Sequence, residues 1–322
     1  MNKFTHINAT SIEEAVLLLQ RYRGRANLIA GGTDLLGKLK DEVMPAYPEA
    51  IINLKSIPGL DFIHYENEML KIGALTRLAD IAAEPIIQSQ YSALAQAASR
   101  TASPHLREMG TLGGNLCQDI RCWYYRSPNN RFPCLRKSAG RCYALTGDDR
   151  YHSIFGGSVE EGCIAVHPSD TAPALIALNA QIKTSRRIIR AQNFFQVDEC
   201  RTTILEDDEI VTEIHVPKPH GKSAFEKFAL RKAIDFPIVN GAAAIEVQDG
   251  LVKTARICLN AVYVIPYKAT LAEQALVGQP LNISSAQAAA DATVSNALPR
   301  HRNQFMVEFT RALVKRLVLA CQ

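Results

Sequence analysis

The chain has 322 residues, of which 47% are hydrophobic and 21% are charged, and its formal net charge is +4. This balance is typical of a globular protein of two or three domains, and it excludes a disordered chain or a protein whose overall charge attracts polyanions. No apolar run approaches the roughly 20 residues of a membrane helix, and residues 1–20 lack the apolar core of a signal peptide. We therefore expect no membrane span and a cytoplasmic location, or a periplasmic one only if a partner subunit carries the chain across.

The first hundred residues predict short strands and amphipathic helices. Ser11 and Glu14 read as a capping box in which each side chain satisfies a backbone amide at the start of a helix. After this helix the pattern predicts strands at 26–30 and 50–54, a hairpin at 62–75 that turns at 66–68, and helices at 76–83 and 91–102.

The rest of the chain has the same mixed character. The pattern predicts a glycine-rich loop at 103–116, a helix and strand within 169–184, a strand at 207–217, two strand runs at 224–230 and 240–248, a further strand at 251–262, and helices over the last ~55 residues. Asp249-Gly250 is a hairpin turn signal. Because strands and helices occur in blocks rather than in strict alternation, the fold class is α+β.

Two glycine pairs, at 31–32 and 113–114, point to a cofactor. Adjacent glycines let backbone amides approach a diphosphate without interference from a Cβ atom, and Thr33 adds a hydroxyl donor. The run 32–38 matches seven positions of a P-loop, but Leu39 stands where a hydroxyl must bind Mg²⁺, which argues against a nucleotide hydrolase. Two such loops favour a large cofactor that contains a diphosphate.

Cysteines are concentrated in one segment. Five of the eight lie close together, namely Cys117, Cys122, Cys134, Cys142 and Cys163. In a reducing compartment this pattern indicates ligands rather than disulfides, and the spacings are too wide and irregular for ordinary zinc knuckles. Four thiolates suit a [4Fe–4S] cluster, and the Lys and Arg residues between 121 and 150 would offset its negative charge. The scattered Cys200, Cys258 and Cys321 are predicted to be buried apolar side chains.

Two other interpretations of this segment remain open. It could be a zinc-stabilised nucleic-acid module with the aromatic residues Trp123, Tyr124, Tyr125, Phe132 and Tyr143, although the small net charge argues against nucleic acid. It could also be purely a docking surface on a flavoprotein. Four isolated histidines, His105, His152, His167 and His215, have no partner in the sequence and are interpreted as structural, although His167 is close enough to Cys163 in sequence to lie beside a cluster ligand.

Five stretches in a fixed order carry a resemblance to a known family. LIAGGTDLL, TLGGN, SDTAPALIALNA, DEIVTEIHVP and KFALRKAIDFP resemble those of the FAD-binding (medium) subunits of the molybdenum hydroxylase, or xanthine dehydrogenase, family. The resemblance covers essentially the whole chain. It implies a two-part FAD-binding domain of the vanillyl-alcohol oxidase type at 1–218, divided at about residue 56. It also implies a smaller C-terminal α+β domain of the carbon monoxide dehydrogenase flavoprotein type at 219–322.

The resemblance also implies a set of residues around FAD. These are Leu28, Ile29, Ala30, Gly31, Gly32, Thr33, Asp34, Leu35, Thr101, Thr111, Leu112, Gly113, Gly114, Asn115, Asp170, Val211 and Lys227. Both glycine loops would wrap the diphosphate, and Asp170 would accept hydrogen bonds from FAD hydroxyls or the adenine. Asp170 could instead cap the helix that follows it, and Lys227 could be a solvated lysine on an edge strand.

Between Asn115 and Asp170 the chain is roughly forty residues longer than most such subunits, and an idle loop of this length is improbable in a compact domain. The insertion, at about 118–165, resembles the extra [4Fe–4S] loop of periplasmic aldehyde oxidoreductase and 4-hydroxybenzoyl-CoA reductase. Five cysteines compete for four ligand positions, and because Cys117 directly follows an expected GGNL strand, its side chain is predicted to be held by packing. The choice of Cys122, Cys134, Cys142 and Cys163 as metal ligands agrees with these two relatives, while replacement of one of them by Cys117 stays open. Because Asn115 and Cys122 can be at most about 25 Å apart, single-electron exchange between cluster and flavin is plausible.

The implied enzyme is a complex. The chain would be its flavin-dependent oxidoreductase subunit, with a large subunit that holds a molybdenum cofactor and a small subunit that holds [2Fe–2S] clusters. An external electron donor or acceptor would react at FAD, and this chain would supply no acid–base catalyst. The substrate stays open between an aldehyde and a 4-hydroxybenzoyl-CoA.

Overall fold

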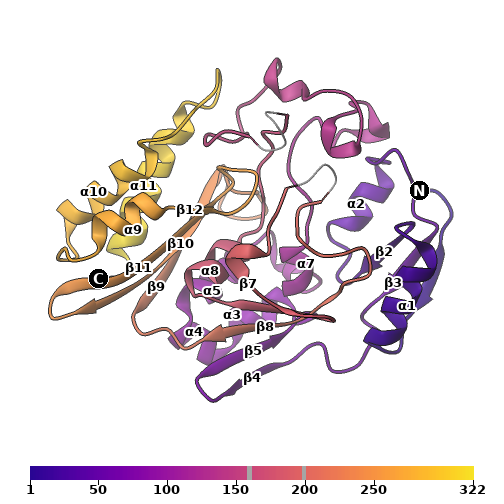
Figure 1. Cartoon of the computed structure of the whole chain (residues 1–322), viewed down its shortest axis with the longest axis horizontal. Coiled ribbons are helices and arrows are strands. Elements are labelled where there is room, and N and C mark those ends of the chain that lie inside the picture. The colour runs from indigo at the N-terminus through magenta and orange to yellow at the C-terminus, as the bar shows by residue number, and fades with distance from the viewer. Residues whose placement is uncertain (158–161, 198–200) are drawn as a thin grey trace.

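Three sheets organise the residues that the computed structural model describes, 1–157, 162–197 and 201–322 (Figure 1). Helices pack on all three sheets, and the cysteine-rich insertion lies beyond them at one edge of the molecule (Figure 1). The expected mixture of strands and helices is confirmed. Cys200 lies outside the described residues.

The N-terminal sheet is parallel and has the strand order β1-β3-β2. Its elements are β1 (Thr5–Asn8), α1 (Ile12–Tyr22), β2 (Ala26–Ile29) and β3 (Ala50–Asn53). Ser11 Oγ accepts from the Glu14 amide at 3.1 Å, as predicted, but the other half of the capping box is wrong. The Glu14 carboxylate binds the amide and hydroxyl of Thr10 instead, because both donors lie within reach one residue earlier.

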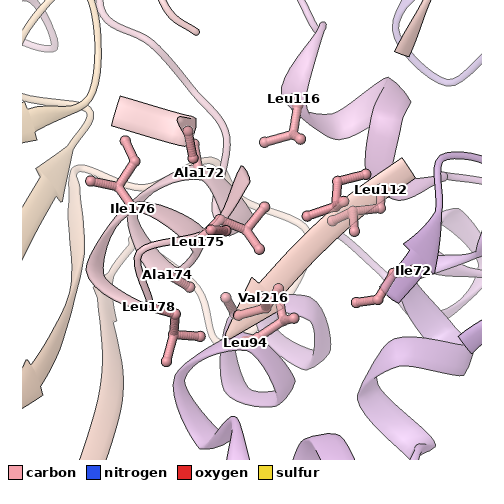
Figure 2. Close-up of a cluster of buried hydrophobic side chains, with 14 of the residues drawn as sticks. Ile72, Leu94, Leu112, Leu116, Ala172, Ala174, Leu175, Ile176, Leu178 and Val216 are labelled. Atoms are coloured by element: carbon pink, nitrogen blue, oxygen red, sulfur yellow. The ribbon is translucent and has the colours of Figure 1, made fainter. Parts of the chain in front are cut away.

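A five-stranded antiparallel sheet, ordered β4-β5-β8-β6-β7, forms the centre. Its strands are β4 (Ile63–Glu66), β5 (Met69–Gly73), β6 (Gln181–Thr184), β7 (Ile188–Arg190) and β8 (Val211–Pro217), and the helices nearby are α3 (Leu78–Ala83), α4 (Pro85–Gln90), α5 (Ser92–Arg100) and α8 (Thr171–Ala177). A turn of 3₁₀-helix, η4 (Ala191–Asn193), follows β7. Figure 2 shows the core here, where Ile72, Leu94, Leu175 and Val216 are fully buried.

The C-terminal sheet is antiparallel, with the order β12-β11-β10-β9. Its elements are β9 (Lys222–Phe228), β10 (Val239–Gln248), β11 (Leu251–Asn260), β12 (Tyr267–Lys268), α9 (Thr270–Leu276), α10 (Ile283–Val294) and α11 (Phe305–Leu319). Helices α9 and α11 pack against this sheet, while α5 and α8 of the preceding part also contact its strands (Figure 1). The sheet is therefore held between two groups of helices, with α5 beside β9 and α8 beside β10 and β11.

The second glycine loop differs from its prediction. Residues 103–116 contain two short helices, α6 (Pro104–Arg107) and α7 (Leu112–Leu116), so Cys117 follows a helix and the predicted GGNL strand is wrong. Thr111 caps α7 by accepting from the Gly114 amide at 3.2 Å. Glycines form a helix poorly by themselves, but tertiary hydrogen bonds to the end of β5 hold this turn in place.

The insertion has little regular structure of its own. It contains three 3₁₀ turns, η1 (Pro128–Asn130), η2 (Leu135–Lys137) and η3 (Tyr143–Leu145). The Arg121 amide donates to the Val166 carbonyl at 3.2 Å, which closes the base of the segment. Across the three described ranges, no helix is long and apolar enough to cross a membrane.

Candidate cofactor sites

A cavity of about 650 Å³ lies between the first glycine loop, α7 and the start of α8. Its volume falls within the range of small-molecule and cofactor sites. Most of the predicted FAD residues line it, namely 28–35, Thr101, Thr111, Gly113, Gly114, Asn115, Asp170 and Val211. Leu112 and Lys227 are not on its wall, because Leu112 is buried in the core and Lys227 is bound to Asp170.

The first glycine loop has free backbone donors at the cavity. The backbone amides of residues 31–34 donate to no acceptor among the described residues. A Cβ atom on Gly31 would lie 1.9 Å from the Met109 carbonyl oxygen, and Gly32 has a φ of 72°, so both positions favour glycine strongly. The loop therefore presents unpaired amides from a conformation that side chains would disrupt.

The second glycine loop is different, because its amides already have partners. Leu112 donates to Thr76 O at 3.0 Å, and Gly113 donates to Ala74 O at 2.9 Å. A Cβ atom on Gly113 would lie 3.0 Å from Ala74, so the glycine permits close packing on the end of β5. The two loops resemble each other in sequence, yet the paired amides of 112–115 leave the second loop with fewer backbone donors for an anion than the first.

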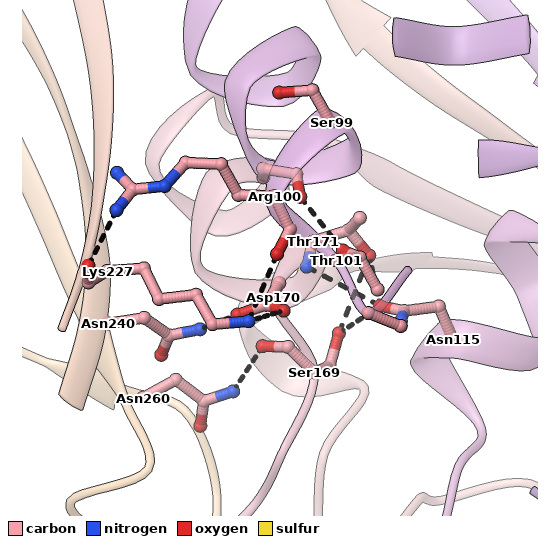
Figure 3. Close-up of polar contacts among 12 residues, drawn as sticks. Ser99, Arg100, Thr101, Asn115, Ser169, Asp170, Thr171, Lys227, Asn240 and Asn260 are labelled. Carbon is pink, nitrogen blue, oxygen red and sulfur yellow. Dashed lines mark hydrogen bonds and ion pairs between the residues drawn. The ribbon is translucent and has the colours of Figure 1, made fainter. Parts of the chain in front are cut away.

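Side chains rather than amides of the second loop face the cavity. The Asn115 Oδ1 atom accepts from Ser169 Oγ at 2.6 Å and from Thr171 Oγ1 at 2.7 Å (Figure 3). These bonds orient the Asn115 side chain and leave its amide nitrogen as the donor. Thr101 lies on the same wall, but its hydroxyl donates to Ala97 O at 2.8 Å.

Asp170 lies at the junction of the cavity and the C-terminal sheet. Lys227 Nζ donates to Asp170 Oδ2 at 2.7 Å, and Asn240 Nδ2 donates to Oδ1 at 2.6 Å (Figure 3). Burial raises the pKa of Asp170, against the opposing effects of Lys227 and Asn240. Asp170 is the N-cap residue of α8, as the capping alternative predicted, but its side chain makes no capping hydrogen bond, and Ser169 Oγ accepts from the Ala172 amide. The solvated alternative for Lys227 is wrong as well, because its residue is only 7% exposed.

The structure brings Cys122, Cys134, Cys142 and Cys163 to the wall of one small pocket of about 20 Å³. Cys117 lines the larger cavity instead. Burial raises the pKa of the Cys122 thiol to about 12, while amides of residues 124 and 125 favour its thiolate. In the described part of the chain, no group of three or more His, Cys, Asp or Glu side chains could hold a single metal ion.

Two cations of the insertion are buried beside the cysteines. Arg136 is 2% exposed and lines the pocket, and Lys137 is 3% exposed. Arg136 donates from Nη2 to Arg201 O at 2.7 Å, but its Nε and Nη1 atoms are buried and have no hydrogen-bond partner among the described residues. A guanidinium in this state is costly unless an anion is close. Arg131, Arg141 and Arg150 are exposed to solvent.

Asp34 ties the first glycine loop to the insertion. Its Oδ1 atom accepts from both Arg121 Nη2 and Arg126 Nη2 at 2.8 Å, and its Oδ2 atom accepts from the Asp119 amide at 3.0 Å. These three contacts come from the start of the insertion. The carboxylate of Asp34 therefore serves to position the cysteine segment against the cavity.

A second set of contacts joins the two sites. Lys38 Nζ and the Tyr125 hydroxyl both donate to the Asp119 carboxylate. Burial would raise the pKa of Asp119, but the charges of Lys38 and Arg126 outweigh it and hold that pKa far below its usual range. Lys38 and Asp119 line the large cavity, whereas Tyr125 lines the cysteine pocket. Sequence reasoning assigned none of these contacts, because residues so far apart in the chain give no signal of them.

The aromatic residues of the insertion pack mostly on one another. Tyr125 is buried, and Tyr124, Phe132 and Tyr143 form a cluster with ring centroids 5.1 to 6.2 Å apart. Trp123 alone of the predicted set is well exposed, at 46%, and it stacks on Tyr151. One exposed ring is a poor platform for nucleic acid, which usually stacks several bases.

The histidines have mixed roles. His105 is exposed, His167 is buried with its Nδ1 atom 3.0 Å from Asn260 Nδ2, and His215 bonds Glu213 at 2.8 Å. Burial lowers the pKa of His167 to about 3 and that of His152 to about 4. His152 is the exception to the purely structural reading, because its Nε2 atom lies 3.3 Å from the Cys122 sulfur.

Comparison with known proteins covers nearly the whole chain. Residues 2–219 match the FAD-binding domain of molybdopterin dehydrogenases, and residues 223–321 match the C-terminal domain of carbon monoxide dehydrogenase flavoproteins. The FAD-binding subunit of aldehyde oxidoreductase from Escherichia coli is 34% identical over 316 residues, 95% of this chain and 94% of the relative. The FAD-subunit of nicotinate dehydrogenase from Eubacterium barkeri is 29% identical over 293 residues, 89% of this chain and 84% of the relative.

A solved structure has the same fold. Carbon monoxide dehydrogenase from Hydrogenophaga pseudoflava includes a chain that superposes with a TM-score of 0.78 at 28% identity, covering 99% of this chain and 97% of that chain. The quinoline 2-oxidoreductase of Pseudomonas putida superposes with a TM-score of 0.77 at 22% identity, which supports the fold alone.

Proposed function

The chain belongs to the family of FAD-binding subunits of molybdopterin dehydrogenases, and from this premise we propose that it carries both FAD and a [4Fe–4S] cluster in a molybdenum hydroxylase-type complex. As a member of the family it is a flavin-dependent oxidoreductase subunit. Its proposed partners are a large molybdenum-cofactor subunit, a small [2Fe–2S] subunit and an external electron donor or acceptor. The cytoplasmic location stays a prediction.

The large cavity is the proposed FAD site. The observation that supports it is the row of unpaired amides at 31–34, which can donate to diphosphate oxygens, on the wall of a cavity of suitable volume. The Asn115 amide and the Thr33 hydroxyl add donors on the same wall. When bound, FAD supplies the two-electron chemistry, and the residues of this chain bind and orient it.

The cysteine pocket is the proposed cluster site. Four thiols from separate positions line it, and buried Arg136 offers two unpaired N–H groups beside them. Each thiolate of a [4Fe–4S] cluster binds a different iron atom, so the sulfur atoms need not surround one point as they would a single ion. Because the pocket measures about 20 Å³, cluster binding requires the loops of the insertion to move outward.

Electron exchange between the two proposed sites is supported by their contact. Asp119 receives hydrogen bonds from Lys38 at the cavity and from Tyr125 at the cysteine pocket, so a short bonded route connects them. The proposed domain organisation keeps 1–218, divided at about 56, as the FAD-binding part with the insertion at about 118–165, and 219–322 as the C-terminal part.

The likeness to a named relative favours one substrate class. The aldehyde oxidoreductase subunit of Escherichia coli matches along 95% of this chain, so an aldehyde is the preferred substrate of the complex, ahead of a 4-hydroxybenzoyl-CoA. Substrate chemistry would take place at the molybdenum site of another subunit. Residues of this chain would only receive or deliver electrons.

A visible spectrum with flavin, iron and zinc analysis of the co-purified complex tests the proposal. One FAD per chain, together with four more iron atoms than the [2Fe–2S] clusters of the partners account for, is the expected result. Flavin without the extra iron would leave the insertion as a docking surface. Zinc without flavin would support the nucleic-acid alternative.

A further inference from the structure

His152 contacts one of the four cysteines directly. Its Nε2 atom lies 3.3 Å from Cys122 Sγ, and the residue is fully buried in the insertion. The other ring nitrogen, Nδ1, is buried and has no hydrogen-bond partner within the described part of the chain. Once Cys122 is a thiolate it can only accept a hydrogen bond, so the neutral ring places its single proton on Nε2, the nitrogen that faces the sulfur.

The C-terminal part of the chain fixes the position of His152. Asn303, a buried residue just before α11, donates from Nδ2 to the carbonyls of His152 and Ser153 at 3.0 and 3.1 Å. A second contact joins the same two segments of the chain, because the Asp149 carboxylate accepts from the Arg302 amide at 2.9 Å. Contacts of this kind, more than a hundred residues away in sequence, hold the imidazole against the sulfur.

From this geometry we infer that His152 is a positioning residue whose N–H hydrogen bond to Cys122 raises the reduction potential of the proposed cluster. The inference rests on the proposed function, since it requires an iron-bound Cys122. A donor to a ligand sulfur stabilises the reduced state more than the oxidised one, because reduction increases the negative charge on sulfur. Reduction of the cluster would take up one electron from an external reductant, and no bond of the protein would form or break.

Substitution of His152 tests the inference in the complete complex. His152→Leu removes the donor, while His152→Gln keeps an N–H group at a similar distance from the backbone. In dye-mediated titrations followed by EPR, the Leu variant should require about a tenfold higher ratio of reduced to oxidised dye for half-reduction of the cluster, equal to about 59 mV for one electron. The Gln variant should have a reduction potential close to that of the wild type. His64→Leu, an exposed change on β4, should have no effect.

The outcomes separate this inference from the proposed function. A wild-type complex without the extra iron refutes both. A full cluster with an unchanged potential in His152→Leu, or equal shifts in the Leu and Gln variants, refutes the hydrogen bond while the cluster site remains. If His152→Leu loses its cluster, the hydrogen bond can be tested in the wild-type complex labelled with ¹⁵N-histidine. Pulsed EPR of the reduced cluster should detect a weak histidine nitrogen coupling, and its absence would overturn the inference.

Discussion

Asp170 and Lys227 are 57 residues apart in the sequence, yet their side chains form a buried ion pair with 2.7 Å between Oδ2 and Nζ (Figure 3). Asp170 precedes α8 and lines the cofactor cavity, whereas Lys227 lies on β9 of the C-terminal sheet. Lys227 Nζ also donates to the carbonyl of Arg100 at the end of α5. One lysine therefore joins the C-terminal sheet to two elements of the cavity wall.

Replacement of Lys227 should destabilise the protein strongly. Lys227→Met leaves the Asp170 carboxylate buried without its counter-charge, and we expect a loss of about 3 to 5 kcal/mol in the free energy of unfolding by urea. Without Lys227 the already raised pKa of Asp170 rises further, so the folded variant takes up a proton. Its stability should fall as pH rises above the unfolded pKa of about 3.9, and the deficit should be larger at pH 8 than at pH 5.

The double variant Asp170→Asn/Lys227→Met is the control, because it removes both charges. It should recover much of the lost stability and the excess pH dependence should disappear. A single variant that loses less than about 1 kcal/mol, equally at both pH values, would show that the pair does not hold the C-terminal sheet to the cavity wall.

The first glycine loop should not tolerate a side chain at Gly31. A Cβ atom there would collide with the Met109 carbonyl, so Gly31→Ala should displace the loop, lower the flavin content to below half and cost about 1 to 3 kcal/mol. Gly37→Ala is a matched change, because no atom lies within 4 Å of the Cβ position on this helical residue. Flavin fluorescence after denaturation gives the occupancy, and equal occupancy in the two variants would contradict the role of the first loop.

Local signals predicted the turns and hairpins well. Asp249-Gly250 has positive φ at both positions, as a type I′ turn requires, and the hairpin around Asn67 has the same feature. Such turns depend on a few neighbouring residues, so the sequence reveals them. The missed helix α7 depends instead on the Leu112 and Gly113 amides, which bind carbonyls of another segment.

The two sites show the same difference between features that depend on local sequence and features that depend on distant contacts. The cysteine count and the order of family stretches indicated which residues to consider, and the structure gathers most of them at two cavities. The cations of the insertion were indicated only as a group, and neither the burial of Arg136 beside the cysteines nor the contact of His152 with Cys122 could be predicted, because these depend on a pocket wall and on Asn303 far along the chain. Tertiary contacts alone make an ordinary Arg or His part of a site.

Glu209 should make the protein sensitive to acid. Burial alone would raise the pKa of this carboxyl, but hydrogen bonds from Arg187 and Thr184 outweigh it and lower the pKa. A lowered folded pKa stabilises the protein above the unfolded value of about 4.3, and this contribution is lost as pH falls through the folded pKa. Glu209→Gln should therefore be less stable than the wild type at pH 7, with the difference vanishing toward pH 3.

Urea unfolding at several pH values measures this effect. Glu68→Gln is a suitable comparison, because its ion pair with Lys218 is exposed and contributes little. A constant difference between wild type and Glu209→Gln from pH 7 to pH 3 would rule out the ionised carboxylate as the cause.

Arg136 should slow the loss of iron only if an anionic cluster occupies the cysteine pocket. Arg136→Met removes the buried cation, and iron loss from the anaerobic complex to a chelator should become roughly tenfold faster. Arg141→Met alters an exposed cation of the same segment and should leave the rate unchanged. If Arg136→Met instead keeps its iron and gains stability, the guanidinium does not balance a cluster.

Iron and acid-labile sulfide, measured per FAD in the purified complex of wild type, Cys134→Ser and Cys117→Ser, test the central claim most directly. The account predicts that Cys134→Ser loses about four iron atoms and four sulfides while FAD stays bound, and that Cys117→Ser keeps all of them. Equal iron and sulfide in all three proteins would contradict it.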